Sequence, residues 1–194
     1  MDAVIAAIRG PEGHIVNISV RRPTTVDELS FTIIREEYLL PSVTWHQIYD
    51  NPWVGILKIN IISATSIEEI QHGIDDLDSR GVTHFVIDLR DNRGGLLSAG
   101  IDIARLFLEE GIVIQEHYRD EETTTYSVIQ PGNYSQIPLV IFVNANTASA
   151  AEIIAGALKA HGRATIVGTP TFGKDSIQLI FDLMDHSSLH VTAA

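Results

Sequence analysis

Two segments in the last third of the chain carry residue types that could perform nucleophilic chemistry. Ser149 lies in the run of small residues "NTASAAE", and Lys174 follows in "TFGKDSIQ". A serine hydroxyl is a weak nucleophile until a base removes its proton, and a lysine amine kept neutral by burial can be that base. The pair indicates a Ser–Lys dyad, although a helix cap at Ser149 and an ordinary surface lysine explain the same residues.

Other side chains bear on the same chemistry. In an extended segment Lys174 and Gln178 point to one face, so the amide of Gln178 could hold the lysine amine by a hydrogen bond. The eight histidines leave a Ser-His-Asp triad as an alternative. His161, however, would stand at the far end of the helix that Ser149 opens, which places it too far away to reach the serine.

A glycine pair could supply electrostatic stabilisation. Gly94 and Gly95 follow an apolar strand-like run, and glycine allows backbone conformations that aim an N–H group into a cleft. The N–H of Gly95, together with that of Ala150, could bind an oxyanion. A tight turn built on Asp91 or Asn92 is the simpler alternative.

Composition excludes several classes of protein. The formal net charge of −12 argues against a nucleic-acid partner, because neutralising phosphates requires clustered Lys and Arg. The absence of cysteine excludes a thiol nucleophile, a disulfide framework and a Cys-based zinc site. No apolar run approaches the roughly 20 residues of a membrane span. His186 and His190 are four residues apart but lack an accompanying carboxylate motif, so we expect neither a metal nor a cofactor.

Apolar patterning alternates between strand-like and helix-like runs, which predicts an α/β fold with a largely parallel sheet. Strands are expected over 14–22, 28–37, 54–61, 83–90, 112–118, 138–144 and 163–168. Helices are expected over 2–8, 66–81 (with Ser66 as N-cap), 96–111 and 148–161, and a polar, mobile stretch over 119–136. Ligand sites in such sheets lie beyond the carboxyl ends of strands. Two such ends, 88–95 and 144–149, carry the candidate residues.

Four segments together resemble the C-terminal processing peptidases, also called tail-specific proteases. They are "AVIAAIRGPEGHIVNISVRRP", "DLRDNRGGLL", "NANTASAAEIIAGAL" and "RATIVGTPTFGKDSIQ", in the family's order and covering almost the whole chain. The resemblance implies a crotonase/ClpP-like α/β core that bears a PDZ domain. It also implies a role for each candidate: nucleophile Ser149, general base Lys174, its partner Gln178, and oxyanion donors Gly95 and Ala150.

The chain departs from the family pattern at several positions. Asp175 follows the lysine where the family usually has glycine, and a carboxylate there favours the charged amine and weakens it as a base. Arg93 replaces the proline that usually precedes the glycine pair. Thr147 and Ala151 replace small residues of the family's nucleophile segment, whereas position 149 remains serine.

The resemblance also suggests a domain organisation. Residues 1–23 are expected to be the C-terminal remnant of a PDZ domain, 24–52 a linker and strand, and 53–194 a peptidase core truncated at its C-terminal end. Because most of the PDZ domain would be missing, Val16, Ile18 and Val20 should be exposed. Because the core would also lack its C-terminal end, we expect the 194-residue chain to be weakly active or inactive. Because most family members work outside the bacterial cytoplasm or in the thylakoid lumen, we expect an export signal upstream of Met1.

The leading hypothesis is a serine endopeptidase that cuts protein substrates near their exposed C-termini, with a homo-oligomer possible. One alternative is a non-catalytic module on the same fold, similar to the ligand-binding repeats of interphotoreceptor retinoid-binding protein. A weaker alternative is an acyl-CoA enzyme of the crotonase type, which would need no lysine. The presence of Ser149, Lys174 and Gln178 together favours the endopeptidase.

Overall fold

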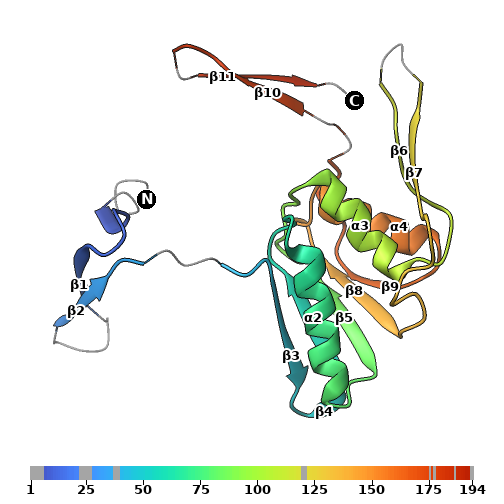
Figure 1. Cartoon of the computed structure of the whole chain (residues 1–194), viewed down its shortest axis with the longest axis horizontal. Helices are drawn as coiled ribbons and strands as arrows, with labels where there is room; N and C mark the ends of the chain where they lie inside the picture. The colour runs from blue at the N-terminus through green and yellow to red at the C-terminus, as the bar shows by residue number, and fades with distance from the viewer. Residues whose placement is uncertain are drawn as a thin grey trace. The chain divides into compact units, whose positions relative to one another are not determined.

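The computed structural model describes residues 7–21, 28–36, 40–118, 122–174, 176, 178–185 and 187–192. The chain divides into two compact units, Met1–Leu40 and Pro41–Ala194 (Figure 1). Each unit is described by itself. None of the described helices is long and apolar enough to cross a membrane.

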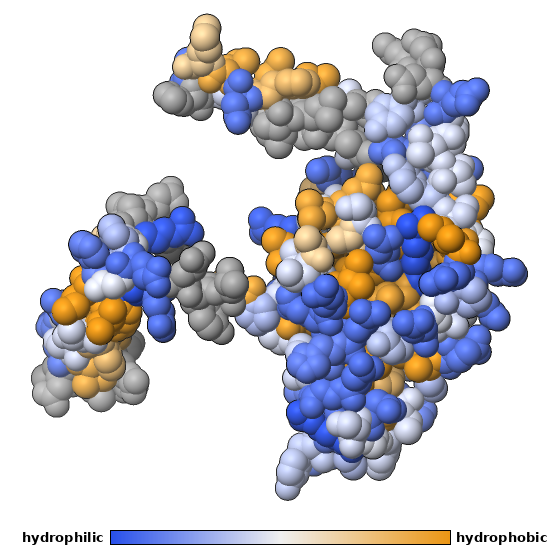
Figure 2. Space-filling view, in the orientation of Figure 1, coloured by the Kyte–Doolittle hydropathy of each residue, from blue (hydrophilic) through white to orange (hydrophobic). Residues whose placement is uncertain are grey.

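The first unit is built on an antiparallel hairpin of β1 (Ile15–Arg21) and β2 (Glu28–Ile34). One face of the hairpin carries the apolar pairs Val16–Ile33, Ile18–Phe31 and Val20–Leu29. The other face carries polar pairs, apart from Ile15–Ile34 at the open end of the hairpin. Figure 2 shows apolar side chains at the surface of this hairpin. Val20 is exposed, as expected, whereas Val16 and Ile18 are half-buried. The helix expected over 2–8 falls mostly outside the described residues.

The second unit contains a five-stranded sheet in the order β3-β4-β5-β8-β9. Its strands are β3 (Val43–Ile48), β4 (Asn51–Ile59), β5 (His84–Asp88), β8 (Leu139–Val143) and β9 (Thr165–Gly168). Only β3 is antiparallel to its neighbour within this sheet. The connecting helices are α2 (Ser66–Ser79), α3 (Leu97–Phe107) and α4 (Ala150–Ala160). The α/β class and the parallel-rich sheet expected from the sequence are confirmed.

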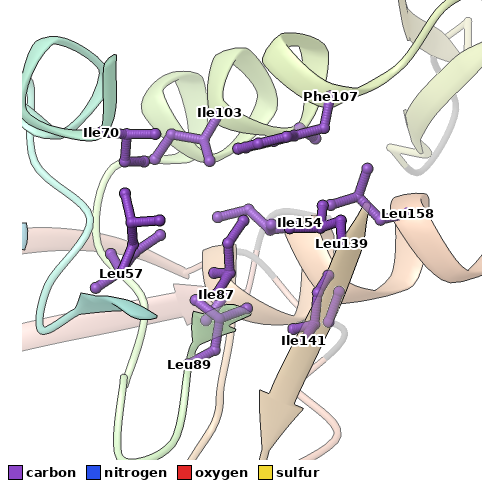
Figure 3. Packing of buried hydrophobic residues seen from close by; sticks show 14 of the residues in the cluster. Leu57, Ile70, Ile87, Leu89, Ile103, Phe107, Leu139, Ile141, Ile154 and Leu158 are labelled. Carbon is purple, nitrogen blue, oxygen red and sulfur yellow. The ribbon is translucent and has the colours of Figure 1, made fainter. Parts of the chain in front are cut away.

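The hydrophobic core lies between one face of this sheet and the helices. The strand order follows the chain order, and crossovers between parallel strands are right-handed, so successive helices lie on the same face. Every second residue of β4 from Gly55 to Ile59 is accordingly buried, and those between are half-buried. Figure 3 shows residues of sheet and helices packed together, including Leu57, Ile70, Ile87, Ile103, Phe107, Ile141 and Ile154.

Several elements differ from the sequence-based expectation. Strand β3 is an additional strand within residues 24–52, the region expected to hold a linker and a strand. Its register against β4 and the 2.8 Å hydrogen bond from Trp45 Nε1 to Asp76 tie it to the core. Helix α2 has Thr65, not Ser66, as its N-cap, because the Ser66 hydroxyl donates to Ser42 at 2.8 Å.

Two separate hairpins complete the unit. The first pairs β6 (Ile112–Glu116) with β7 (Thr124–Ser127), so part of the stretch expected to be mobile is a strand. The second pairs β10 (Gln178–Asp182) with β11 (Ser188–Thr192). Figure 2 shows apolar side chains on the surface of this second hairpin.

The core predicts a difference between two isoleucines. Ile154 of α4 is 0% exposed and Ile129 is 84% exposed. Substituting Ile154→Ala should lower the free energy of unfolding by about 2–5 kcal/mol, because the buried side chain leaves a cavity. The control Ile129→Ala should change it by less than about 0.5 kcal/mol. Urea denaturation followed by the fluorescence of Trp45 and Trp53 measures both values, and equal effects would contradict the assigned core.

Candidate active site

Ser149 stands in a strained turn between β8 and α4. Its backbone angles are φ 55° and ψ −125°, and a positive φ is uncommon for a residue other than glycine. Such a conformation costs about 1–3 kcal/mol and persists only where the surroundings hold it, as they often do at functional sites. The buried side chains around it, Ala148, Ala150 and Ala151, are small. A strand, a strained serine and a helix in succession form the same arrangement as a nucleophile elbow.

The N-terminus of α4 is capped by a carboxylate. The N–H of Ser149 donates to Glu152 Oε2 at 2.9 Å, which is half of the capping-box pattern found at this helix start. The N–H of Glu152 lies 2.7 Å from the carbonyl oxygen of Ser149, so it has a backbone acceptor. In the capping box the same N–H also faces the Ser149 side chain, and the backbone acceptor would remain if the hydroxyl moved away.

The same carboxylate also binds the segment that carries Lys174. The N–H of Gly173 donates to Glu152 Oε1 at 2.7 Å, and the N–H of Lys174 donates to Oε2 at 3.0 Å. Because the N–H groups of Ser149 and Lys174 share one acceptor oxygen, the distance between their backbone nitrogens cannot exceed the sum of the two hydrogen-bond lengths. The N–H of Phe172 adds a bond to the carbonyl of Thr147 at 2.9 Å. Backbone contacts thus bring the two candidate catalytic segments together.

Glu152 is held in its ionised form by these contacts. Burial disfavours its charge, but hydrogen bonds from the Thr171 side chain and from the backbone of Gly173, Lys174 and Ser149 lower its pKa below the ordinary value. Only the capping role of Glu152 could be predicted from the sequence, because Glu152 lies three residues after Ser149. The bonds to Gly173 and Lys174 cross a sequence distance that no local pattern spans.

The side chains of the dyad are less closely joined than their backbones. Lys174 is exposed, and among the described contacts no hydrogen bond connects it to the Ser149 hydroxyl. Gln178 begins β10, but its side chain lies outside the described residues, as does Asp175. The structure therefore brings Ser149 and Lys174 into one neighbourhood and leaves the role of Gln178 a prediction.

The triad alternative finds no support at His161. This residue is the C-cap of α4, at the opposite end of the helix from Ser149. Its Nε2 lies 2.8 Å from the carbonyl of Ile112, a contact that ties the helix end to β6.

The glycine pair lies beside the serine. A side chain on Gly94 would come within 2.9 Å of Ser149 Cβ and 3.1 Å of the Ala150 nitrogen. The N–H of Gly94 is already bound to Asn92 Oδ1 at 2.8 Å. The N–H groups of Gly95 and Ala150, in contrast, have no acceptor among the described residues. These are the two donors that the sequence assigned to an oxyanion.

Gly95 could not be replaced by another residue without rebuilding the loop. Its φ is 151°, and a Cβ there would lie 1.9 Å from the carbonyl oxygen of Ile62. That carbonyl accepts the N–H of Leu96 at 2.9 Å, and the N–H of Ile62 donates to the carbonyl oxygen of Gly94 at 3.1 Å. The loop is therefore fastened to the chain that follows β4, close against its backbone.

Two buried polar side chains fix this loop to the serine turn. Asn92 is 0% exposed. Its side-chain Nδ2 donates to the backbone carbonyl of Ile59 at 2.7 Å, and its backbone carbonyl accepts the N–H of Ala148 at 2.9 Å. Thr147, also 0% exposed, donates its hydroxyl to the carbonyl of Leu89 at 2.8 Å. The ends of β4, β5 and β8 are joined in this way.

An ion pair between the exposed Arg90 and the buried Asp88 follows at the end of β5. Arg90 donates to both oxygens of Asp88, at 2.8 and 2.7 Å, and its guanidinium lies 5.2 Å from the centroid of the Phe142 ring. Burial opposes ionisation of Asp88, but the bonds from Arg90 lower its pKa. The pair keeps the end of β5 rigid next to the glycine loop.

A cleft of about 690 Å³ opens between α4 and the chain that leaves β9. Glu152 and Lys159 are the charged residues of its lining. The remaining lining is small or apolar: Val143, Ala155, Gly156, Ile166, Gly168, Thr169, Pro170 and Thr171. The segment before Lys174 thus borders an open cleft on this side, and its contacts with Glu152 and Thr147 hold it against the serine turn.

The chain is similar to known peptidases over most of its length. The family model of peptidase family S41 matches residues 53–194. The chain is 37% identical over its whole length to a carboxyl-terminal-processing protease of Picosynechococcus sp., of which it covers 47%. It is 34% identical over 96% of its length to the chloroplastic carboxyl-terminal-processing peptidase 2 of Arabidopsis thaliana, of which it covers 37%.

A solved structure, that of the photosystem II D1 C-terminal processing protease, aligns with this chain with a TM-score of 0.66 and 29% sequence identity. The alignment covers 95% of this chain and 51% of that protease chain. The chain therefore spans about half the length of this structure, and less than half of the two curated relatives. These relatives are named as proteases, which does not favour a non-catalytic binding module. By the family match and by these identities, the chain belongs to peptidase family S41.

Proposed function

We propose that this chain carries the catalytic centre of a serine endopeptidase that processes proteins near their C-termini, with Ser149 as nucleophile and Lys174 as general base. One observation carries the proposal. The strained serine turn and the lysine-bearing segment donate backbone N–H groups to the same oxygen of Glu152. A nucleophile and its base must come within reach of one proton, and this shared acceptor supports that approach.

The reaction follows from the groups present. Neutral Lys174 takes the proton of the Ser149 hydroxyl as the oxygen attacks the substrate carbonyl, and it then gives that proton to the leaving amine. Water hydrolyses the acyl-enzyme by the same proton transfers in the second half of the reaction. The unbonded N–H groups of Gly95 and Ala150 are proposed to bind the oxyanion of both tetrahedral intermediates, each worth about 3–4 kcal/mol where such donors have been measured.

Lys174 must lose its proton before it can act. A substrate lying over the exposed amine would remove water from it and favour the neutral form. Gln178 is proposed to hold the amine by a hydrogen bond that adds no charge. Lys suits this role better than Arg, whose guanidinium stays protonated in proteins.

The finer assignments follow the same proposal. We assign the core to the crotonase/ClpP-like type, and residues 1–23 to the C-terminal remnant of a PDZ domain that would select substrates by their exposed C-termini. Relatives include chloroplastic and bacterial processing peptidases, which supports a location outside the cytoplasm or in a lumen. A homo-oligomer is compatible with this organisation.

Replacement of the dyad tests the function. In the protein expressed from its complete natural reading frame, Ser149→Ala and Lys174→Met should each lower kcat for an unfolded protein substrate at least a thousandfold, since nucleophile or base is lost. Lys174→Arg keeps the charge but cannot act as a base, so it should be equally inactive. Gel and mass-spectrometric analysis of the products measures the rates, and cleavage that survives Ser149→Ala would reject the assignment.

Ionisation of Glu152 is expected to hold the lysine segment in place. Its folded pKa is lowered, so this stabilisation is complete above the ordinary pKa of a glutamate and is lost as the pH falls through the folded value. The amide proton shifts of Ser149, Gly173 and Lys174, measured by NMR, should move together with a midpoint below that of an ordinary glutamate. Glu152→Gln should abolish this shared titration. Independent midpoints, or a midpoint at the ordinary value, would contradict a common carboxylate.

A further inference from the structure

Asp91 has an unusual backbone conformation that the proposed chemistry does not use. Its φ is 65°, and among the described residues only Asp91 and Ser149 combine a positive φ with a side chain. The two residues follow the ends of β5 and β8, which are neighbouring strands. Asp91 is exposed, so packing does not impose its conformation.

A closed set of hydrogen bonds joins Asp91 to the serine turn. The N–H of Asp91 donates to Asn144 Oδ1 at 3.0 Å, and Asn144 Nδ2 donates back to Asp91 Oδ1 at 3.0 Å. Asn146 Nδ2 donates to the same carboxylate oxygen at 2.9 Å, and the N–H of Asn146 donates to Asn144 Oδ1 at 3.1 Å. The bonds from Asn146 and Asn144 also lower the pKa of Asp91, which keeps the acceptor ionised.

These bonds connect the two halves of the proposed oxyanion site. Asp91 begins the loop that ends at Gly95, whereas Asn144 and Asn146 belong to the turn that presents Ser149 and Ala150. On the buried side, Asn92 and Thr147 join the same two segments. The hydrogen bonds of Asp91 form a second connection on the solvent side. The loop is therefore bonded to the serine turn both in the interior and at the surface.

We infer that Asp91 is a positioning residue that fixes the Gly95 N–H relative to Ser149 and Ala150, and so sets the geometry of oxyanion binding. The inference rests on the proposed function, because it assigns a task within the same site. An aspartate meets both requirements of the position. It tolerates the left-handed backbone region better than most residues, and one of its oxygens accepts both asparagine amides.

Three substitutions separate these requirements. Asp91→Asn keeps an oxygen that can accept both amides and tolerates the positive φ. Asp91→Gly relieves the backbone strain but removes the acceptor. Asn146→Ala removes one donor and leaves residue 91 untouched. Asp76→Ala is the matched control, because Asp76 is a remote carboxylate that also accepts side-chain hydrogen bonds, from Trp45 and Arg80.

The assay uses the protein from its complete natural reading frame, with a peptide substrate and the aldehyde of the same peptide, which adds to the serine as a tetrahedral mimic. Asp91→Gly and Asn146→Ala should lower kcat about tenfold, since small displacements of an oxyanion donor weaken transition-state binding. KM should stay within about twofold, and the inhibition constant of the aldehyde should rise in proportion to the loss of kcat. Asp91→Asn and Asp76→Ala should retain the wild-type values.

Different results would contradict the positioning role of Asp91 and the proposed peptidase activity. Wild-type kcat in both Asp91→Gly and Asn146→Ala would overturn the positioning role while leaving the peptidase intact. The same holds if kcat falls without any change in aldehyde affinity, or if Asp91→Asn is as impaired as Asp91→Gly. Absence of Ser149-dependent cleavage in the wild-type protein would instead overturn the proposed function, and the positioning role with it.

Discussion

The buried amide of Asn92 determines where the chain can place its reactive groups. It lies at the end of the central strand β5, donates to the end of β4 and accepts the N–H of Gly94. A buried amide that loses such a bond leaves an unsatisfied polar group at a cost of about 1–3 kcal/mol, so these partners are strongly specified. Because Asn92 occupies the N–H of Gly94, the free donor of the loop is the next one, that of Gly95.

Strain at Ser149 depends on this frame. A serine held at φ 55° would relax unless both sides of its turn were fixed. On the strand side, Thr147 is bonded to Leu89, and the N–H of Ala148 to Asn92. On the helix side, Glu152 holds the Ser149 N–H. The small residues around the turn keep the nucleophile accessible, which agrees with a functional rather than a packing role for the conformation.

Local patterns predicted the parts of this structure that depend on local chemistry. Alternating apolar runs gave the parallel strands and their helices, and the family resemblance pointed to Ser149 and Lys174. Strand β3 was not among the expected strands, because Trp45 and its neighbours are fixed by pairing with β4 and by Asp76, contacts that follow from tertiary structure. Ser66 failed as a cap for a similar reason, since its hydroxyl is bonded to Ser42 in the buried layer.

The candidate site shows the same division between local and distant information. The sequence indicated the glycine loop, the serine turn and the lysine as separate segments, but not what joins them. Asp91 and Asn92 were considered only as turn residues, although their contacts reach Asn144, Asn146 and Ala148. Such bonds cross more than fifty residues, and a single sequence gives no spacing rule for them. The role of the Gln178 side chain as a hydrogen-bond partner of Lys174 remains a prediction from its position in an extended segment.

The way in which Glu152 joins the proposed nucleophile and the proposed base bears on the proposed chemistry. Had the carboxylate formed an ion pair with the Lys174 amine, it would favour the charged form and weaken the base. It binds backbone N–H groups of Ser149, Gly173 and Lys174 instead, and no ion pair involves the Lys174 amine among the described residues. Position is therefore fixed through the main chain, and Glu152 forms no direct ion pair with the amine of the proposed base. A carboxylate used in this way joins the two proposed catalytic segments without occupying the lysine side chain.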